Sequence, residues 1–120
     1  MQFQSILQDL VLNVDGAHGA IFLDSDGEAV DWYTRGDAEL LRLRAAYIAV
    51  IVHTCRDVSS RLGLGPLEEL VLEYEGNNCL IREVEHGYFF FLELDPFSNL
   101  AEAQRFVIPA IESLLAEIAA

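Results

Sequence analysis

The feature that most constrains the fold of this chain is a run of eight residues, AAYIAVIV at positions 45–52, that contains no polar side chain. Asp37 before the run is a plausible N-cap, and Gly63 followed by Gly65-Pro66 is a helix stop, so the run lies inside a helix predicted over 38–62. A helix that is apolar on all sides must be covered on more than one side. We expect a sheet to cover one side and a further protein surface to cover the other.

Two periodic patterns precede this helix. Apolar residues recur at three- and four-residue steps over 3–14, which predicts an amphipathic helix. The runs 17–23 and 28–34 are separated by a turn signal and predict a β-hairpin, with Val30 and Trp32 on one side of the second strand.

Three strand-like runs follow the long helix, over 67–75, 78–85 and 88–95. The loops between them are short, which favours an antiparallel meander. The last run contains YFFFLEL, apolar on both faces, as expected of a central strand that is covered on both sides. The acidic residues of the first two runs are interpreted as the solvent side of those strands.

A final helix is predicted to begin at Asn99, because Glu102 three residues later completes the pattern of a capping box. Pro109 is expected to kink or restart this helix. Its buried stripe is predicted to consist of Leu100, Val107, Ile111, Leu114 or Leu115, and Ile118. The element order is therefore α-β-β-α-β-β-β-α, an α+β fold with a single five-stranded antiparallel sheet flanked by helices. Residues 1–120 contain no linker or repeat, so we expect one domain.

The charge of the chain restricts its partners. The formal net charge is −13, with 20 acidic and 7 basic residues, and the chain has no lysine. Such a field disfavours nucleic acid and anionic membranes, and a P-loop lacks its lysine. The sequence has neither a run of about 18 apolar residues nor a basic N-terminal signal region. We therefore expect no membrane span and a cytoplasmic location.

Residues that could carry chemistry are not arranged as known sites. The three histidines lie far apart, and the serines lack a nearby histidine in a nucleophile elbow. The segment 24–28 has part of a calcium-loop pattern, but its flanking runs are strands, so a plain turn is favoured. Cys55 and Cys79 lie in apolar runs and are interpreted as buried hydrophobic residues rather than a disulfide or metal pair. We expect no catalytic residue, metal or cofactor.

The succession GAIFLDSDG, RLGLG, HGYFFFLELD and the following NL resembles the Roadblock/dynein light chain family, and the likeness covers nearly the whole chain. The chain looks like a bacterial or archaeal Roadblock-type protein, with the Roadblock/longin-like, profilin-like architecture. The resemblance implies a homodimer in which the strand 67–75 pairs with its copy and continues the sheet. It also implies that the two long helices pack side by side.

The resemblance further implies that the dimer binds and regulates a Ras-like small GTPase without inserting a catalytic arginine. The outward face of the long helix becomes the candidate GTPase contact, and the strand becomes the candidate dimer contact. These interface residues are Arg42, Ala45, Ala46, Ala49 and His53 on the helix, and Leu70, Val71, Leu72, Glu73 and Tyr74 on the strand. Two alternatives stay open: a dimeric adaptor for a signalling, motility or motor complex, and a small-molecule sensor or enzyme.

Overall fold

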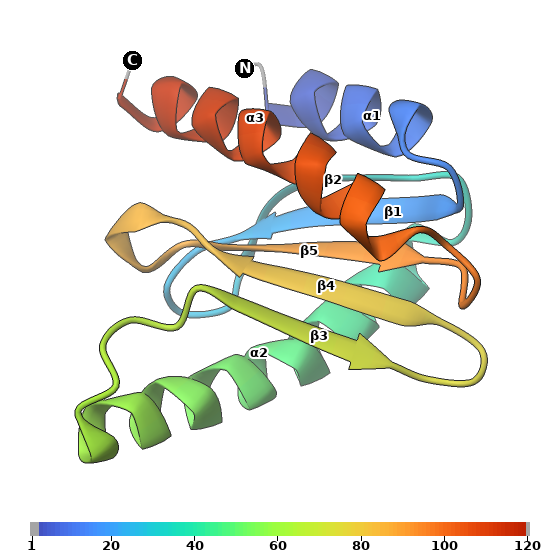
Figure 1. The fold of residues 1–120 in the computed structure, drawn as a ribbon. Helices are drawn as coiled ribbons and strands as arrows, with labels where there is room; N and C mark the ends of the chain where they lie inside the picture. The colour runs from blue at the N-terminus through green and yellow to red at the C-terminus, as the bar shows by residue number, and fades with distance from the viewer. Residues whose placement is uncertain (1–2, 120) are drawn as a thin grey trace.

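The computed structural model describes residues 3–119 and contains the predicted succession of helices and strands (Figure 1). In chain order the elements are α1 (Phe3–Asn13), β1 (Ala17–Leu23), β2 (Ala29–Thr34), α2 (Ala38–Leu62), β3 (Glu69–Glu73), β4 (Asn78–Glu83), a 3₁₀ turn (Glu85–Gly87), β5 (Phe89–Leu94) and α3 (Leu100–Ala119). The predicted α+β fold class and element order are confirmed.

The five strands form one antiparallel sheet in the order β2-β1-β5-β4-β3. The predicted central position of the YFFFLEL strand is confirmed, because β5 lies between β1 and β4 and all six of its residues are buried. This strand order is possible because α2 crosses one face of the sheet and connects the β2 edge to the β3 edge (Figure 1). β3 has no neighbour on its outer side among the described residues.

The sheet separates two hydrophobic cores. Helices α1 and α3 lie together on one face, whereas α2 alone lies on the other (Figure 1). Alternate residues of β5 serve the two cores: Phe90 and Leu92 face α1 and α3, and Phe89 and Phe91 face α2. Each fully buried phenylalanine contributes roughly 1.5–3 kcal/mol of hydrophobic free energy.

The predicted helix boundaries are set by local hydrogen bonds. Asp37 caps α2 by accepting hydrogen bonds from the backbone N–H groups of Glu39 and Leu40, and Gly63 ends the helix in the left-handed conformation at φ 64°. Asn99 caps α3 by accepting from the backbone N–H of Glu102 at 3.0 Å. Pro109 was expected to kink or restart the last helix; α3 runs through it, so the helix does not restart there.

One prediction for the hairpin is wrong. The register between β1 and β2 shifts, so that Phe22 pairs with Asp31 whereas Leu23 pairs with Ala29, and Val30 is the extra residue between them. An inserted residue reverses the in-out alternation of a strand. Val30 therefore packs against the α1–α3 core and Trp32 against the α2 core, on opposite sides of the sheet.

Candidate interaction surface

The orientation of α2 on the sheet determines which of its apolar residues remain uncovered. The residues that face the sheet are Leu41, Ala45, Ile48, Ala49 and Val52. A second set of apolar residues lies on the side away from the sheet and is exposed. We call this set the apolar stripe; it consists of Leu40, Leu43, Tyr47, Val50, Val58 and Leu62.

The apolar stripe includes residues of the all-apolar run 45–52. Tyr47 is 70% exposed and Val50 is 63% exposed, although both lie in the segment without a polar side chain. The chain's own sheet therefore covers only one side of this segment. Exposed large apolar side chains that gather on one helix face are typical of a surface that binds another protein.

A cleft continues the apolar stripe toward the β3 edge. Its volume is about 430 Å³, with Tyr47 and Ile51 of α2 on one side and Tyr74 on the other. Cys79 and Phe91 also line it. Burial, followed by the negative charge of Glu93, raises the pKa of the Cys79 thiol to about 11, while Arg44 lowers it. Cys79 is therefore a neutral thiol at physiological pH and not a nucleophile.

A buried charge lies beside this cleft. Glu93 of β5 is 3% exposed and accepts a hydrogen bond from Arg44 Nη1 at 2.8 Å. Asn77 Nδ2 donates to the same carboxylate oxygen, Oε2, at 3.4 Å. A buried carboxylate requires such partners because removing it from water is costly. The pair fixes the N-terminal half of α2 over the central strand.

Alternate side chains of the edge strand β3 pack against the two cores. Leu70 and Leu72 are half-buried against the α2 core, and Val71 is half-buried against the α1–α3 core. Glu73 and Tyr74, at the end of the strand, are exposed. Like the cleft and the stripe, this edge offers groups that a second protein can pair with.

The glutamates of β3 and β4 are not all on a solvated side, as the sequence had suggested. Glu69 accepts hydrogen bonds from Arg82 at 3.4 Å and from Gln104 of α3 at 2.8 Å. Glu83 is bound to Arg56 on α2. These two carboxylates are partly buried and connect the sheet to a helix on either face.

The predicted outward position of two alanines is wrong. Ala45 is 1% exposed and Ala49 is 7% exposed, because small side chains at these positions let α2 approach the sheet closely. A Cβ atom added to Gly27 would lie 3.0 Å from the Ala49 Cβ, so the β1–β2 turn rests directly on this helix. A substitution such as Ala49→Arg would therefore disturb the fold.

The other predicted helix residues, Arg42, Ala46 and His53, are exposed. A second hollow on the α2 face joins Arg42 and Ala46 to Gly27 and Glu28 of the β1–β2 turn. We call Arg42, Ala46 and His53 the polar flank of α2. Three of the five predicted helix residues thus lie on this flank, and none of the five belongs to the apolar stripe.

The arginines near α2 are bound within the molecule. The guanidinium of Arg42 lies 4.7 Å from the centre of the Trp32 ring, and Arg35 Nη2 donates to the Val11 carbonyl at 3.3 Å. Arg44 and Arg56 bind Glu93 and Glu83. These side chains attach α2 and the strand before it to the rest of the fold.

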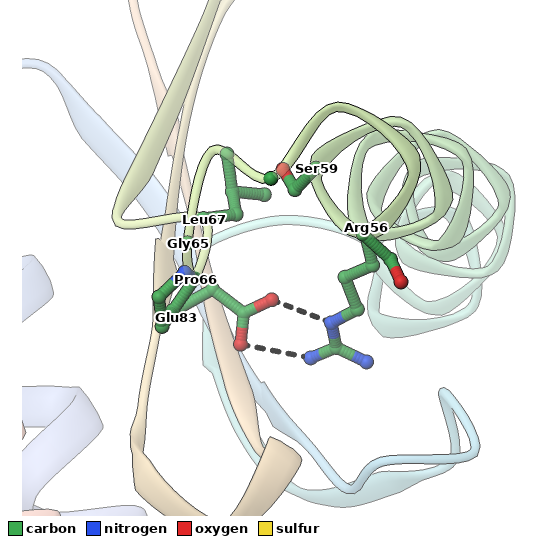
Figure 2. A pocket seen from close by; sticks show the side chains of 8 residues that line it. Arg56, Ser59, Gly65, Pro66, Leu67 and Glu83 are labelled. Carbon is green, nitrogen blue, oxygen red and sulfur yellow. Dashed lines mark hydrogen bonds and ion pairs between the residues drawn. The ribbon is translucent and has the colours of Figure 1, made fainter.

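A further cavity of about 540 Å³ lies at the C-terminal end of α2 (Figure 2). Ser59, Gly65, Pro66 and Leu67 line it, and the dashed lines in Figure 2 join Arg56 to Glu83. Among the described residues, Arg56 is the only basic residue that lines the cavity, and Glu83 already neutralises it.

Other features bear on the expected chemistry. Over residues 3–119, no cluster of three or more His, Cys, Asp or Glu residues is arranged to hold a metal ion. Cys55 and Cys79 are free thiols. Within the same residues, no helix has the length and hydropathy needed to cross a bilayer.

The fold and surface are those of a small α+β domain in which an open sheet edge, β3, lies beside a helix with an uncovered apolar face. A family model, the Roadblock/LC7 domain, matches residues 4–92. The chain belongs to this family. A search of the curated proteins found no significant match.

Solved structures share the fold. A Roadblock/LC7 domain from Streptomyces avermitilis has a TM-score of 0.89 at 16% identity, and the alignment covers 98% of each chain. MglB from Myxococcus xanthus has a TM-score of 0.89 at 12% identity over 99% of this chain and 96% of that one. An MglB structure described as having a tetrameric arrangement has a TM-score of 0.80 at 18% identity, over 92% of this chain and 82% of that one.

Proposed function

We propose that this protein is a cytoplasmic homodimer whose interface consists of the apolar stripe, the adjoining cleft and the β3 edge. The observation that carries the proposal is the exposure of Tyr47 and Val50 on a helix segment with no polar side chain. Two copies of the β3 edge could hydrogen-bond to each other, and two copies of α2 would then lie side by side. This arrangement covers the apolar and hydrogen-bonding groups that one copy leaves open.

The size of the surface supports a dimer. A stable interface buries about 800 Å² on each partner, which corresponds to 20–30 residues a side. The apolar stripe extends from Leu40 to Leu62, nearly the full length of α2, and the cleft joins it to Tyr74. The described MglB structure shows that a protein of this fold can self-associate.

We further propose that the dimer binds a Ras-like small GTPase and regulates it. Family membership supports this function, because the Roadblock resemblance implies such partners. The polar flank of α2 is the surface that we assign to the GTPase, since the dimer would cover the opposite flank, where Tyr47 and Ile51 lie. The chain would act by biasing the switch loops of its partner and would perform no catalysis of its own.

The test of GTPase binding uses the purified dimer and a small GTPase encoded near this chain, loaded with GDP or with a GTP analogue. We expect nucleotide-dependent binding and an altered hydrolysis rate. His53→Glu should weaken binding, whereas Gln8→Glu, which adds the same charge on α1 across the sheet, should not. Equal binding of both nucleotide states with unchanged hydrolysis would contradict regulation.

One observation favours a second candidate, a dimeric adaptor. Arg42, Arg44 and Arg56 are held by their own chain, so these three side chains serve the fold first. An adaptor would use the same surfaces to hold a partner without changing hydrolysis. The hydrolysis measurement therefore separates the two functions.

A further inference from the structure

The hydrogen-bond pattern of β3 determines which of its residues can pair with a partner strand. Tyr74 N–H donates to the Asn77 carbonyl at 3.0 Å, and Glu83 N–H donates to the Glu68 carbonyl at 3.0 Å. These two contacts belong to one antiparallel ladder, in which hydrogen-bonded and non-hydrogen-bonded pairs alternate. The even-numbered residues of β3 therefore turn their backbone groups toward β4. The odd-numbered residues, Glu69, Val71 and Glu73, turn theirs outward.

The outward groups restrict how two copies of β3 can pair. In an antiparallel pair, directly opposite residues place their side chains on the same face of the sheet. Leu70 and Leu72 must remain on the α2 face in both copies, so even-numbered residues must lie opposite even-numbered residues. The two-fold axis of the dimer therefore passes between one residue and its own copy. Centring on Val71 uses all three outward residues of the strand in both copies. Centring on Leu70 or Leu72 leaves one outward residue of each strand without a partner inside the other strand.

The register centred on Val71 has an electrostatic consequence. It places Glu69 of each copy directly opposite Glu73 of the other, which gives two pairs of like charges by symmetry. Glu69 is already bound by Arg82 of β4 and Gln104 of α3. Glu73 is exposed, and the structure gives it no ion pair among the described residues; its neighbour across the ladder is the amide Asn78. The unbalanced charge in each pair is therefore that of Glu73.

We propose, on the basis of the dimer proposed above, that β3 pairs with a second copy in a register centred on Val71 and that Glu73 restrains this self-association. Backbone hydrogen bonds hold the dimer at this edge, and the Glu69–Glu73 pairs weaken it. Charged side chains on edge strands limit pairing in this way. The strength of the dimer consequently depends on the ionic strength, because salt screens exposed like charges.

The test measures the dimer dissociation constant of the full chain by sedimentation equilibrium at low and at physiological salt. Glu73→Gln removes both like-charge pairs and should tighten the dimer by roughly 2- to 30-fold at low salt. Glu73→Arg should tighten it further, because an arginine would attract Glu69. Wild-type protein should tighten as salt rises, and Glu73→Gln should respond less.

Glu75→Gln is the matched control, since it removes one exposed charge from the same segment beyond the end of the strand. In a register centred on Leu72, Glu69 would face Glu75 instead, so a larger effect of Glu75→Gln would overturn the proposed register. A dimer that responds to neither substitution would overturn the inference and leave the homodimer intact. A wild-type protein that stays monomeric at all concentrations would overturn both.

Discussion

Arg56 binds Glu83 through two parallel hydrogen bonds, from Nε to Oε1 at 2.5 Å and from Nη2 to Oε2 at 2.9 Å, and thereby joins α2 to the end of β4. The same guanidinium donates to the Gly87 carbonyl at 2.7 Å and lies over the Phe89 ring. One side chain thus connects the helix that carries the apolar stripe to two strands of the sheet.

Arg56→Met should lower the free energy of unfolding by about 2–3 kcal/mol, because it leaves the half-buried Glu83 and the Gly87 carbonyl without a charged donor. Urea titration measures this change. Arg61→Gln is the control: the Arg61–Asp57 pair is 76% and 62% exposed, so its loss should cost less than about 1 kcal/mol. Equal costs for the two variants would show that Arg56 does not anchor the helix.

Arg44→Met should destabilise the protein more than the double variant Arg44→Met/Glu93→Leu. The single substitution leaves Glu93 buried with only the long Asn77 contact, whereas the double substitution removes the buried charge as well. Chemical denaturation of the two variants measures the difference. If the double variant were the less stable one, Glu93 would have a stabilising role beyond its pair with Arg44.

Cys79 should make stability fall as the pH rises. Burial raises the pKa of its thiol to about 11 in the folded protein, above the value of 9.0 for a free thiol. The folded state therefore favours the neutral thiol, and this contribution is fully present below pH 9 and is lost as the pH rises toward 11. Cys79→Ala should show a smaller loss of stability over this interval than the wild type. Equal pH profiles would contradict the raised pKa.

Neighbouring positions on α2 should separate folding from assembly. Ala49→Arg should destabilise the fold by about 3 kcal/mol or more, because Ala49 packs against the sheet and the Gly27 turn. Val50→Arg should keep the folded circular dichroism spectrum and weaken the dimer, because Val50 points away from the sheet. The account would be contradicted if Val50→Arg unfolded the chain and Ala49→Arg did not.

The element order was predictable because both ends of α2 and the start of α3 have local chemical signals. Asp37, Gly63 and Asn99 act through hydrogen bonds or backbone conformations that depend on residue type alone. The central position of β5 was likewise predictable, since only a strand covered on both faces can be apolar on both faces. The side assignment in β2 failed because the inserted residue Val30 leaves no periodic signal of its own.

An uncovered apolar face on α2 was predictable, but the residues that form it were not. A helix segment that is apolar all round has no polar face to show how it is rotated on the sheet. Ala45, Ala46 and Ala49 were assigned to the outward face because the family resemblance places the partner contact there, and small residues would allow close approach of a partner. The close approach is instead to the sheet, at Ala45 and Ala49, and the large residues Tyr47 and Val50 face away from it.

The central claim is that a second copy covers the apolar stripe, and the molar mass in dilute solution tests it most directly. Sedimentation equilibrium should give twice the chain mass of 13.4 kDa for the wild type, and a mass close to one chain for Tyr47→Arg. Phe97→Arg is the control, because Phe97 is 96% exposed but lies outside the stripe, and it should stay dimeric. A wild-type mass of one chain at every concentration, with Tyr47 still exposed, would contradict the account.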